Sequence, residues 1–323
     1  MTSTTRRALL AGLLASGLCA CSPDQPQIRR LVIATGGHGG VYYALGSAFG
    51  SVLSRRWGTD VTVKETGASI ENLNLVADGH ADLGFSTIDA VALAVHGRAP
   101  FAGPMPVSCL AELYDDYLQA VVRADSSLRS VADLAAAVVS VGPHASGTEL
   151  VALRLLDLLQ VRPRRLERLG VSEAADALRS GAIECFFFSG GLPTPAIAAL
   201  GAVVPLRLLP LGDQVPELVR RHGDVYFRRT IPAKVYGTTT KVVTLGAPNL
   251  LVTRETMSAD LAYLLTRLLF ESRPALEKAH PEARHLHERT AVYTGPVPLH
   301  PGAVRYYREA KYGVSSGVGL TSS

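Results

Sequence analysis

Four of the five residues from Gly36 to Gly40 are glycines, and they directly follow an apolar run in the stretch ATGGHGGVYYALG (34–46). A glycine-rich turn between a strand and a helix lets a ligand approach the backbone closely. The turn also directs unpaired N–H groups and the positive end of the helix dipole at that ligand. The chemistry that such a turn supports is the binding of a phosphate or a carboxylate.

Two more helix starts could bind the same ligand. One begins near Ser69 in TGASIEN (66–72). The other begins at SGTE, in which Ser146 and Glu149 have the spacing of a capping box. One anionic group bound by two or three helix N-termini would need no arginine.

The tyrosines after the glycine turn separate it from known nucleotide-binding motifs. A P-loop would need GK[ST], which is missing, and a dinucleotide-binding turn would need glycine or alanine where Tyr42 stands. Tyr42 and Tyr43 can instead supply a hydroxyl group and an aromatic wall to a ligand. Because adjacent helix positions do not easily face one cleft, the sequence leaves open which of them faces it.

Patterns typical of catalysis or of a metal site are missing from the sequence. His38 and His144 occupy related turns, but no HExxH or CxxC spacing accompanies them. Ser146 is flanked like a helix cap and unlike a nucleophile elbow. The formal net charge of +4 is small and dispersed, which argues against nucleic acid as a partner. We therefore predict a protein that binds a small molecule without transforming it, with no cofactor and no metal.

The N-terminus resembles a bacterial export signal. An arginine pair (6–7) precedes the uncharged run ALLAGLLASGLCA (8–20), which is too short to span a bilayer as a mature helix. Leucine at −3 and a small residue at −1 before Cys21 resemble a lipobox. We predict a lipoprotein signal peptide at 1–20, lipidation of Cys21 and a polar tether at 21–29. A plain cleaved signal is an alternative, and the general secretory and twin-arginine export routes both stay open.

Strand and helix patterns alternate along the rest of the 323-residue chain, which is long enough for two domains. The first series contains strands at 30–35, 60–66 and 81–86 and helices at 41–56 and 69–79. A similar series follows at 136–191, where Gly181 ends a helix as Gly79 does in the first. Such an alternation predicts mainly parallel sheets with helices on both faces.

The fold class that we predict is α/β with two lobes, each a mainly parallel sheet flanked by helices. The first lobe comprises 30–116 and 247–323, and the second comprises 117–246. Open parallel sheets bind ligands at the carboxyl ends of their strands, so a ligand cleft is expected between the lobes. Cys109 and Cys185 lie in apolar runs, and the sequence does not decide between a disulfide and two buried thiols.

Seven ordered blocks within residues 30–309 resemble one known family, and a chance match of all seven is improbable. The blocks are ATGGHGGVYYALG, TGASIENLNLVADGHADLGFSTIDA, VSVGPHASGTE, FFFSGGLPTPAI, IPAKVYG, GAPNLLVTRE and PLHPGAVRYYRE. They are similar to the TAXI family, the solute receptors of tripartite ATP-independent periplasmic (TRAP) transporters. The resemblance implies a type II periplasmic-binding-protein fold that closes by hinge motion. It implies no enzymatic activity, no cofactor and delivery of a solute to a membrane permease.

The resemblance also implies which segments bind the solute. The expected ligand-binding residues are Thr35, Gly36, Gly37, His38, Tyr42, Tyr43, Ser69, Asn72, Thr87, Asp89, Ser146, Gly147, Thr148, Gly190, Gly191 and Thr194. Members of the family are associated with glutamate, glutamine or 2-oxoglutarate-like ligands, which agrees with the anion-binding turns. Asp89 could recognise an amine of the solute or cap the helix that follows it.

Three positions depart from the family pattern. His38 stands where a small residue is usual, Ala44 replaces a frequent proline, and Thr87 stands where glutamine is common. The solute could therefore differ from glutamate. We expect a monomer at the outer face of the cell membrane as a lipoprotein, or in the periplasm. The alternatives are a binding component of an ATP-driven importer or a sensor system, and an enzyme on a two-lobed binding-protein scaffold.

Overall fold

The computed structural model describes residues 28–312. The strands are β1 (Arg30–Ala34), β2 (Asp60–Lys64), β3 (Leu83–Thr87), β4 (Val107–Arg123), β5 (Val138–Ser140), β6 (Arg165–Glu167), β7 (Cys185–Gly190), β8 (Leu206–Leu209), β9 (Phe227–Ile231) and β10 (Val242–Arg254). The α-helices are α1 (Val41–Trp57), α2 (Ser69–Ala77), α3 (Ile88–Val95), α4 (Gly147–Leu158), α5 (Val171–Ser180), α6 (Pro195–Gly201), α7 (Val215–His222), α8 (Ala259–Glu271), α9 (Arg273–Ala279) and α10 (Pro301–Tyr312). The short 3₁₀ helices of this range are η1 (Val131–Ala136), η2 (Gly212–Gln214), η3 (Val235–Gly237) and η4 (Pro281–His285).

One continuous sheet links the strands in the order β2-β1-β3-β10-β4-β7-β5-β6, while β8 pairs with β4 and β9 with β10. Strand β1 is parallel to β2 and β3, and β5 is parallel to β6 and β7. The α/β class predicted from the sequence is confirmed. The expectation of mainly parallel sheets is right for these two groups of strands. It is wrong at the centre, where β4 and β10 pair antiparallel with each other and with β7 and β3.

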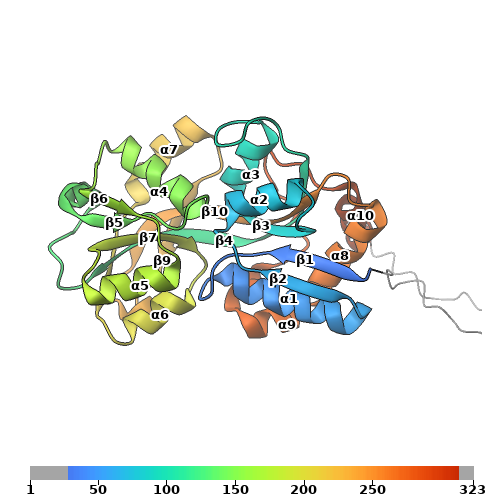
Figure 1. Ribbon diagram of the computed structural model, residues 1–323, viewed down its shortest axis with the longest axis horizontal. Coiled ribbons are helices and arrows are strands. Elements are labelled where there is room, and N and C mark those ends of the chain that lie inside the picture. The colour runs from blue at the N-terminus through green and yellow to red at the C-terminus, as the bar shows by residue number, and fades with distance from the viewer. Residues whose placement is uncertain (1–27, 313–323) are drawn as a thin grey trace, which may run out of the picture.

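The two central strands connect the two halves of the molecule (Figure 1). Strands β1–β3 lie with α1–α3 and α8–α10 on one side, and β5–β7 lie with α4–α7 on the other. Both central strands are long, with 17 residues in β4 and 13 in β10, so each contributes to both halves. The lobe boundaries expected at 116/117 and 246/247 fall inside these strands and stay a prediction. The predicted signal peptide, Cys21 and most of the tether lie outside the described residues.

Short sequence signals account for the helix ends. Gly79 follows α2 at φ +74° and Gly181 ends α5 at φ +79°. Glycine adopts this left-handed backbone without a steric penalty, so the helix-stop role predicted for both glycines is confirmed. Ser146 caps α4, because its hydroxyl accepts a hydrogen bond of 2.9 Å from the N–H group of Glu149.

The apolar core covers both faces of the sheet, and Cys109 and Cys185 are part of it. Both cysteines are buried free thiols, so the structure decides the question that the sequence left open against a disulfide. Burial raises the pKa of both thiols, which keeps them protonated. Within residues 28–312, no helix is long and apolar enough to cross a membrane.

Candidate functional site

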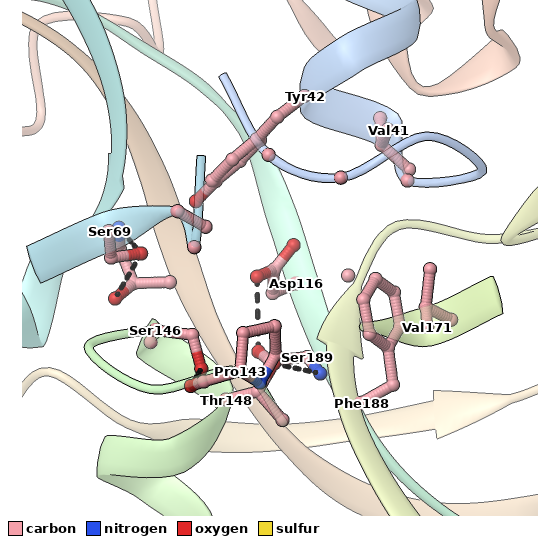
Figure 2. Close-up of a pocket in the computed structure, with 18 of the residues that line it drawn as sticks. Val41, Tyr42, Ser69, Asp116, Pro143, Ser146, Thr148, Val171, Phe188 and Ser189 are labelled. Atoms are coloured by element: carbon pink, nitrogen blue, oxygen red, sulfur yellow. Dashed lines mark hydrogen bonds between the residues drawn. The ribbon is translucent and has the colours of Figure 1, made fainter. Parts of the chain in front are cut away.

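A pocket lies where the carboxyl ends of β1, β3, β5 and β7 meet the starts of helices α1, α2, α4 and α5 (Figure 2). It is lined by Gly36, Gly37, Gly40, Val41, Tyr42, Gly67, Ala68, Ser69, Thr87, Tyr114, Asp116, Pro143, Ser146, Gly147, Thr148, Gly170, Val171, Phe188, Ser189 and Gly190. Both halves of the molecule contribute to this wall. The location agrees with the general rule that open α/β sheets bind ligands beyond the carboxyl ends of their strands.

Residues that line the pocket from both halves carry unpaired backbone N–H groups. The N–H groups of Gly36 and Gly37 in the glycine turn have no hydrogen-bond acceptor among residues 28–312. The same holds, within that range, for the N–H groups of Gly147 and Thr148 in the first turn of α4. Both sets belong to helix N-termini, where the helix dipole favours negative charge.

The start of α2 differs from the expectation. Its N–H groups at Ile70 and Glu71 donate to the carbonyl oxygen of Ala145, at 3.0 and 3.2 Å. Ala145 belongs to the other half of the molecule. This helix start therefore serves mainly to join the two halves and offers fewer N–H groups to a ligand than the sequence suggested.

The hydroxyl groups of the pocket differ in whether they already donate a hydrogen bond within the protein. The Ser146 hydroxyl is engaged, because it also donates a hydrogen bond of 2.7 Å to the carbonyl of Pro143 while it caps α4. The Thr148 hydroxyl accepts from the Ser189 N–H group at 3.0 Å, and the Ser69 hydroxyl accepts from the Thr87 N–H group at 3.2 Å. A hydroxyl that accepts keeps its own proton for donation, so Thr148 and Ser69 can each donate to an anion.

Polar side chains from the central strands form the floor of the pocket. Asp116 and Tyr114 lie on β4, and Asn249 on β10 accepts a hydrogen bond from the Tyr42 hydroxyl. Asp116 is 2% exposed, and its Oδ2 atom accepts a hydrogen bond of 3.0 Å from the Ser189 hydroxyl. Burial raises the pKa of Asp116 to about 7, and the neighbouring Asn249 and Ser189 side chains limit the rise. Burial likewise raises the pKa of Tyr42 and Tyr114, so both phenols stay neutral.

Apolar side chains complete the wall. Val41, Val171, Pro143 and Phe188 surround the polar floor, and Figure 2 shows the Phe188 ring beside Val171, across the pocket from Ser69. The cavity measures about 60 Å³. A water molecule needs roughly 10–15 Å³ on this scale, so the cavity holds only a compact solute.

The sequence prediction and the pocket wall agree in part. The expected residues that line the pocket are Gly36, Gly37, Tyr42, Ser69, Thr87, Ser146, Gly147, Thr148 and Gly190. Of the two tyrosines, Tyr42 lines the pocket, and the Tyr43 ring packs against His38 at a tilt of 32°, with ring centroids 3.9 Å apart. His38 itself is exposed and pairs with Glu65 at 2.8 Å. Neither His38 nor Tyr43 reaches the pocket wall.

Thr35 and Asn72 lie behind the wall and have structural partners. The Asn72 amide donates to the carbonyls of Thr35 and Phe85 at 2.6 and 2.8 Å. The Thr35 hydroxyl donates to the carbonyl of Lys64 at 2.9 Å. These bonds fasten the glycine turn to the neighbouring strand ends, so the two residues position the site from outside the cavity.

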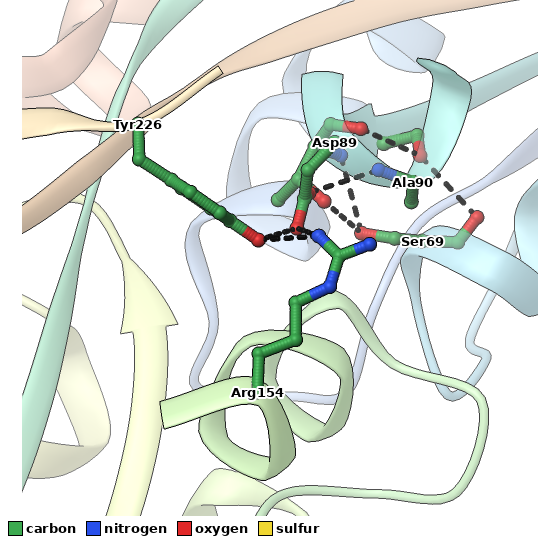
Figure 3. A network of polar contacts seen from close by, with 7 residues as sticks. Ser69, Asp89, Ala90, Arg154 and Tyr226 are labelled. Atoms are coloured by element: carbon green, nitrogen blue, oxygen red, sulfur yellow. Dashed lines mark hydrogen bonds and ion pairs between the residues drawn. The ribbon is translucent and has the colours of Figure 1, made fainter. Parts of the chain in front are cut away.

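Asp89 also lies outside the pocket wall, in a buried ion pair (Figure 3). Its Oδ2 atom accepts a hydrogen bond of 2.6 Å from the Tyr226 hydroxyl and lies 3.3 Å from Nη1 of Arg154. Its Oδ1 atom accepts from the Ala90 N–H group at 2.9 Å, near the start of α3. Thr87 and not Asp89 occupies the N-cap position of α3, so Asp89 does not cap this helix. Its contacts with Arg154 and Tyr226 form a bond between the halves, and its role towards an amine of the solute stays a prediction.

Gly191 and Thr194 lie just beyond β7 and outside the pocket wall. The Thr194 hydroxyl donates to the carbonyl of Gly191 at 2.9 Å and accepts from the Gln119 amide at 3.2 Å. A Cβ atom on Gly191 would lie 3.1 Å from the Tyr114 ring, so this segment packs behind the floor.

The sequence did not predict several side chains of the wall: the apolar Val41, Ala68, Pro143, Val171 and Phe188, and the polar Tyr114, Asp116 and Ser189. One signal was available, because the apolar strand pattern of β4 is interrupted by the acidic pair DD at 115–116. Residues two apart on a strand share a face, so Tyr114 and Asp116 belong together. Which face meets the cavity depends on how β4 crosses between the halves.

The sequence of residues 33–310 matches the NMT1-like family, and the match extends over both halves of the molecule. The chain belongs to the NMT1-like family. Solved structures show the fold that this member shares with distant proteins. MatC from Rhodopseudomonas palustris, solved with bound malate, superposes with a TM-score of 0.55 at 14% identity over 90% of this chain and 97% of MatC. An ancestral arginine-binding protein bound to arginine gives a TM-score of 0.50 at 13% identity over 78% of this chain and 97% of its own.

A structure described as a periplasmic transporter gives a TM-score of 0.51 at 13% identity, over 90% of this chain and 94% of its own. At these identities the likeness concerns the fold alone. This NMT1-like protein therefore has a periplasmic-binding-protein-like α/β fold with a central sheet.

Proposed function

We propose that this protein is an extracytoplasmic receptor that binds a small carboxylate-bearing solute between its two halves. The observation that carries the proposal is the set of unpaired N–H groups of Gly36, Gly37, Gly147 and Thr148, which come from both halves. A carboxylate there would accept hydrogen bonds at two helix N-termini, with the dipoles favouring its charge. The Thr148 and Ser69 hydroxyls can donate further bonds.

The remaining wall suits the carbon skeleton of such a solute. Tyr42 and Phe188 offer aromatic faces, and the cavity admits only a compact molecule. The titratable side chains of the wall are Tyr42, Tyr114 and Asp116, and burial keeps both tyrosines neutral. Ser146, the serine of SGTE, is engaged as a helix cap and has no base beside it in the described wall. The arrangement supports holding a solute and offers no activated nucleophile.

We further propose that the receptor is of the TAXI type and delivers its solute to a TRAP permease. The support is the order of the seven sequence blocks, which run from ATGGHGGVYYALG to PLHPGAVRYYRE. In this proposal Cys21 carries the lipid that tethers the receptor to the outer face of the cell membrane. Uptake into vesicles that contain the permease would then depend on an ion gradient and on added receptor. Uptake that required ATP would contradict the TRAP assignment.

Thermal denaturation against a solute panel tests the binding function. The panel contains amino acids, 2-oxo acids, dicarboxylates, sugars and phosphate esters. A ligand of the native state at 100 times its Kd adds about 2.7 kcal/mol of stability, which raises the midpoint by several degrees. We expect such a shift with carboxylates and none with sugars. A shift with sugars or phosphate esters alone would contradict the carboxylate site, and product formation from a panel member would contradict a purely binding role.

A further inference from the structure

Asp116 is the one charged side chain in the described wall of the pocket. It is 2% exposed, and its Oδ1 atom has no hydrogen-bond partner within residues 28–312. Its other oxygen, Oδ2, is satisfied by the Ser189 hydroxyl. A buried carboxylate oxygen without a partner is costly, and native proteins rarely keep one without a reason. Asp116 lines the pocket, so a group of a bound ligand can supply the missing partner.

Among residues 28–312, no positively charged group pairs with Asp116. The groups that face it are Tyr42 from α1, Tyr114 and Asp115 from β4, Ser189 from β7, Asn249 from β10 and Glu282 from η4. Asp115 forms a salt bridge with Arg229, in which Oδ2 of Asp115 lies 2.6 Å from Nη2 of Arg229. Glu282 and Asp115 are negative, so they disfavour a second carboxylate near Asp116. The Tyr114 hydroxyl is also buried without a partner among the described residues.

We propose that Asp116 binds the ammonium group of an α-amino acid whose carboxylate lies at the N–H groups of Gly147 and the glycine turn. This inference rests on the proposed function and narrows it. An ammonium group supplies the N–H donors that Oδ1 lacks and the positive charge that the pocket lacks. A 2-oxo acid has a carbonyl oxygen in place of the amine and would leave Oδ1 unpaired. A dicarboxylate without an amine would bring a negative charge beside Asp116 with no arginine in the described wall to offset it.

In this proposal, amino-acid binding is coupled to the release of protons from the pocket. Burial raises the pKa of Asp116 to about 7 in the free protein, so the side chain is mostly protonated at lower pH. Pairing with an ammonium group requires the ionised form and lowers this pKa. Amino-acid binding therefore releases protons at pH values near and below 7, and the affinity falls as the pH is lowered.

The test is titration calorimetry of the full chain with matched pairs of acids. The pairs are alanine with pyruvate, glutamate with 2-oxoglutarate and leucine with 4-methyl-2-oxopentanoate. Each is measured at about pH 8 and about pH 5.5, in two buffers with different ionisation enthalpies, so that proton release is counted. A hydrogen bond to a charged group is worth about 1.5–3 kcal/mol, so at the higher pH the best amino acid should bind roughly 10- to 150-fold tighter than its oxo acid.

Asp116→Asn is the informative variant, and Asp176→Asn is its control, because it removes one carboxylate from an exposed ion pair on α5. In Asp116→Asn we expect the preference for the amine and the proton release to disappear, while oxo-acid binding persists and reports a folded pocket. Asp176→Asn should behave like the wild type. If Asp116→Asn fails to fold, the proton release that accompanies amino-acid binding by the wild type still tests the inference.

Three results would overturn the inference. The first is equal or tighter binding of the oxo acid by the wild type. The second is an amine preference that survives in Asp116→Asn, and the third is amino-acid binding without proton release at the lower pH. In all three the protein still binds a carboxylate, so the proposed function stands. Absence of binding by every acid in the panel would overturn the proposed function and this inference together.

Discussion

Among single residues, Gly147 determines how closely the two halves approach over the pocket. A Cβ atom at this position would lie 2.7 Å from the Ser69 hydroxyl oxygen and 2.8 Å from that of Thr87, both on the other half. Gly147→Ala should therefore hinder closure around a solute without disturbing its own helix. Overpacking of this kind costs about 1–3 kcal/mol, so we expect solute affinity to fall roughly 5- to 150-fold.

Titration calorimetry measures this loss, and Gly103→Ala is the matched control, since a Cβ atom there meets nothing within 4 Å. The control should bind like the wild type. Wild-type affinity in Gly147→Ala would show that the halves do not close at this contact.

Because Asp116 is buried, we predict that the free energy of unfolding of the solute-free protein depends on pH. Its ordinary pKa of 3.8 is raised to about 7 by burial, so between these values the folded state binds the proton more tightly than the unfolded state. The stabilising contribution of the protonated form is present below about pH 4 and is lost as the pH rises through 7. Relative to the wild type, Asp116→Asn should gain about 4 kcal/mol between these limits. Urea denaturation across this pH range measures it, and a constant difference between the two proteins would contradict the buried carboxyl.

At the scale of elements, helix α1 is held against the sheet by a small residue. Gly46 lies over β1 and β3, where an added Cβ atom would overlap the methyl group of Thr35 and lie 3.3 Å from the Phe85 ring. Alanine is the better helix former by about 1 kcal/mol, so helix propensity alone predicts that Gly46→Ala stabilises the protein. We expect the opposite, a loss of about 1–3 kcal/mol, because packing outweighs propensity here.

Urea denaturation compares this variant with Ser51→Ala on the exposed face of the same helix. The control should change the free energy of unfolding by less than about 0.5 kcal/mol. A stabilised Gly46→Ala would mean that α1 does not pack as closely as the structure has it.

The elements also show what the sequence could and could not predict. Helices such as α1 and α4 and strands such as β1 and β3 follow from local apolar periods and glycine stops, so their places were predictable. The antiparallel crossing of β4 and β10 depends on pairing between segments more than 100 residues apart, such as Ala111 with Leu251, which no local pattern encodes. For the same reason the sequence did not predict Asp116 and Tyr114 as residues of the pocket. Residues behind the wall, such as Asn72, carry the same kind of side chain as residues that line it, and only packing distinguishes them.

At the scale of the whole molecule, a buried ion pair joins the two halves. Arg154 on α4 pairs with Asp89 at the start of α3, and the Tyr226 hydroxyl bridges them. Arg154→Met would leave the Asp89 carboxylate buried without its cation, which costs about 3–5 kcal/mol. We expect a loss of that size in the free energy of unfolding. Arg179→Met, which breaks the exposed pair with Asp176, should cost less than about 1 kcal/mol. Equal losses in the two variants would contradict the joining role.

The crystal structure of the protein with the carboxylate that gives the largest thermal shift tests the central claim most directly. We predict that the carboxylate of the solute lies within hydrogen-bond distance of the N–H groups of Gly147 and Thr148 and of the glycine turn at Gly36–Gly37. Both halves would then contact one solute molecule. A solute bound elsewhere, or a solute whose carboxylate points away from these N–H groups, would contradict the account.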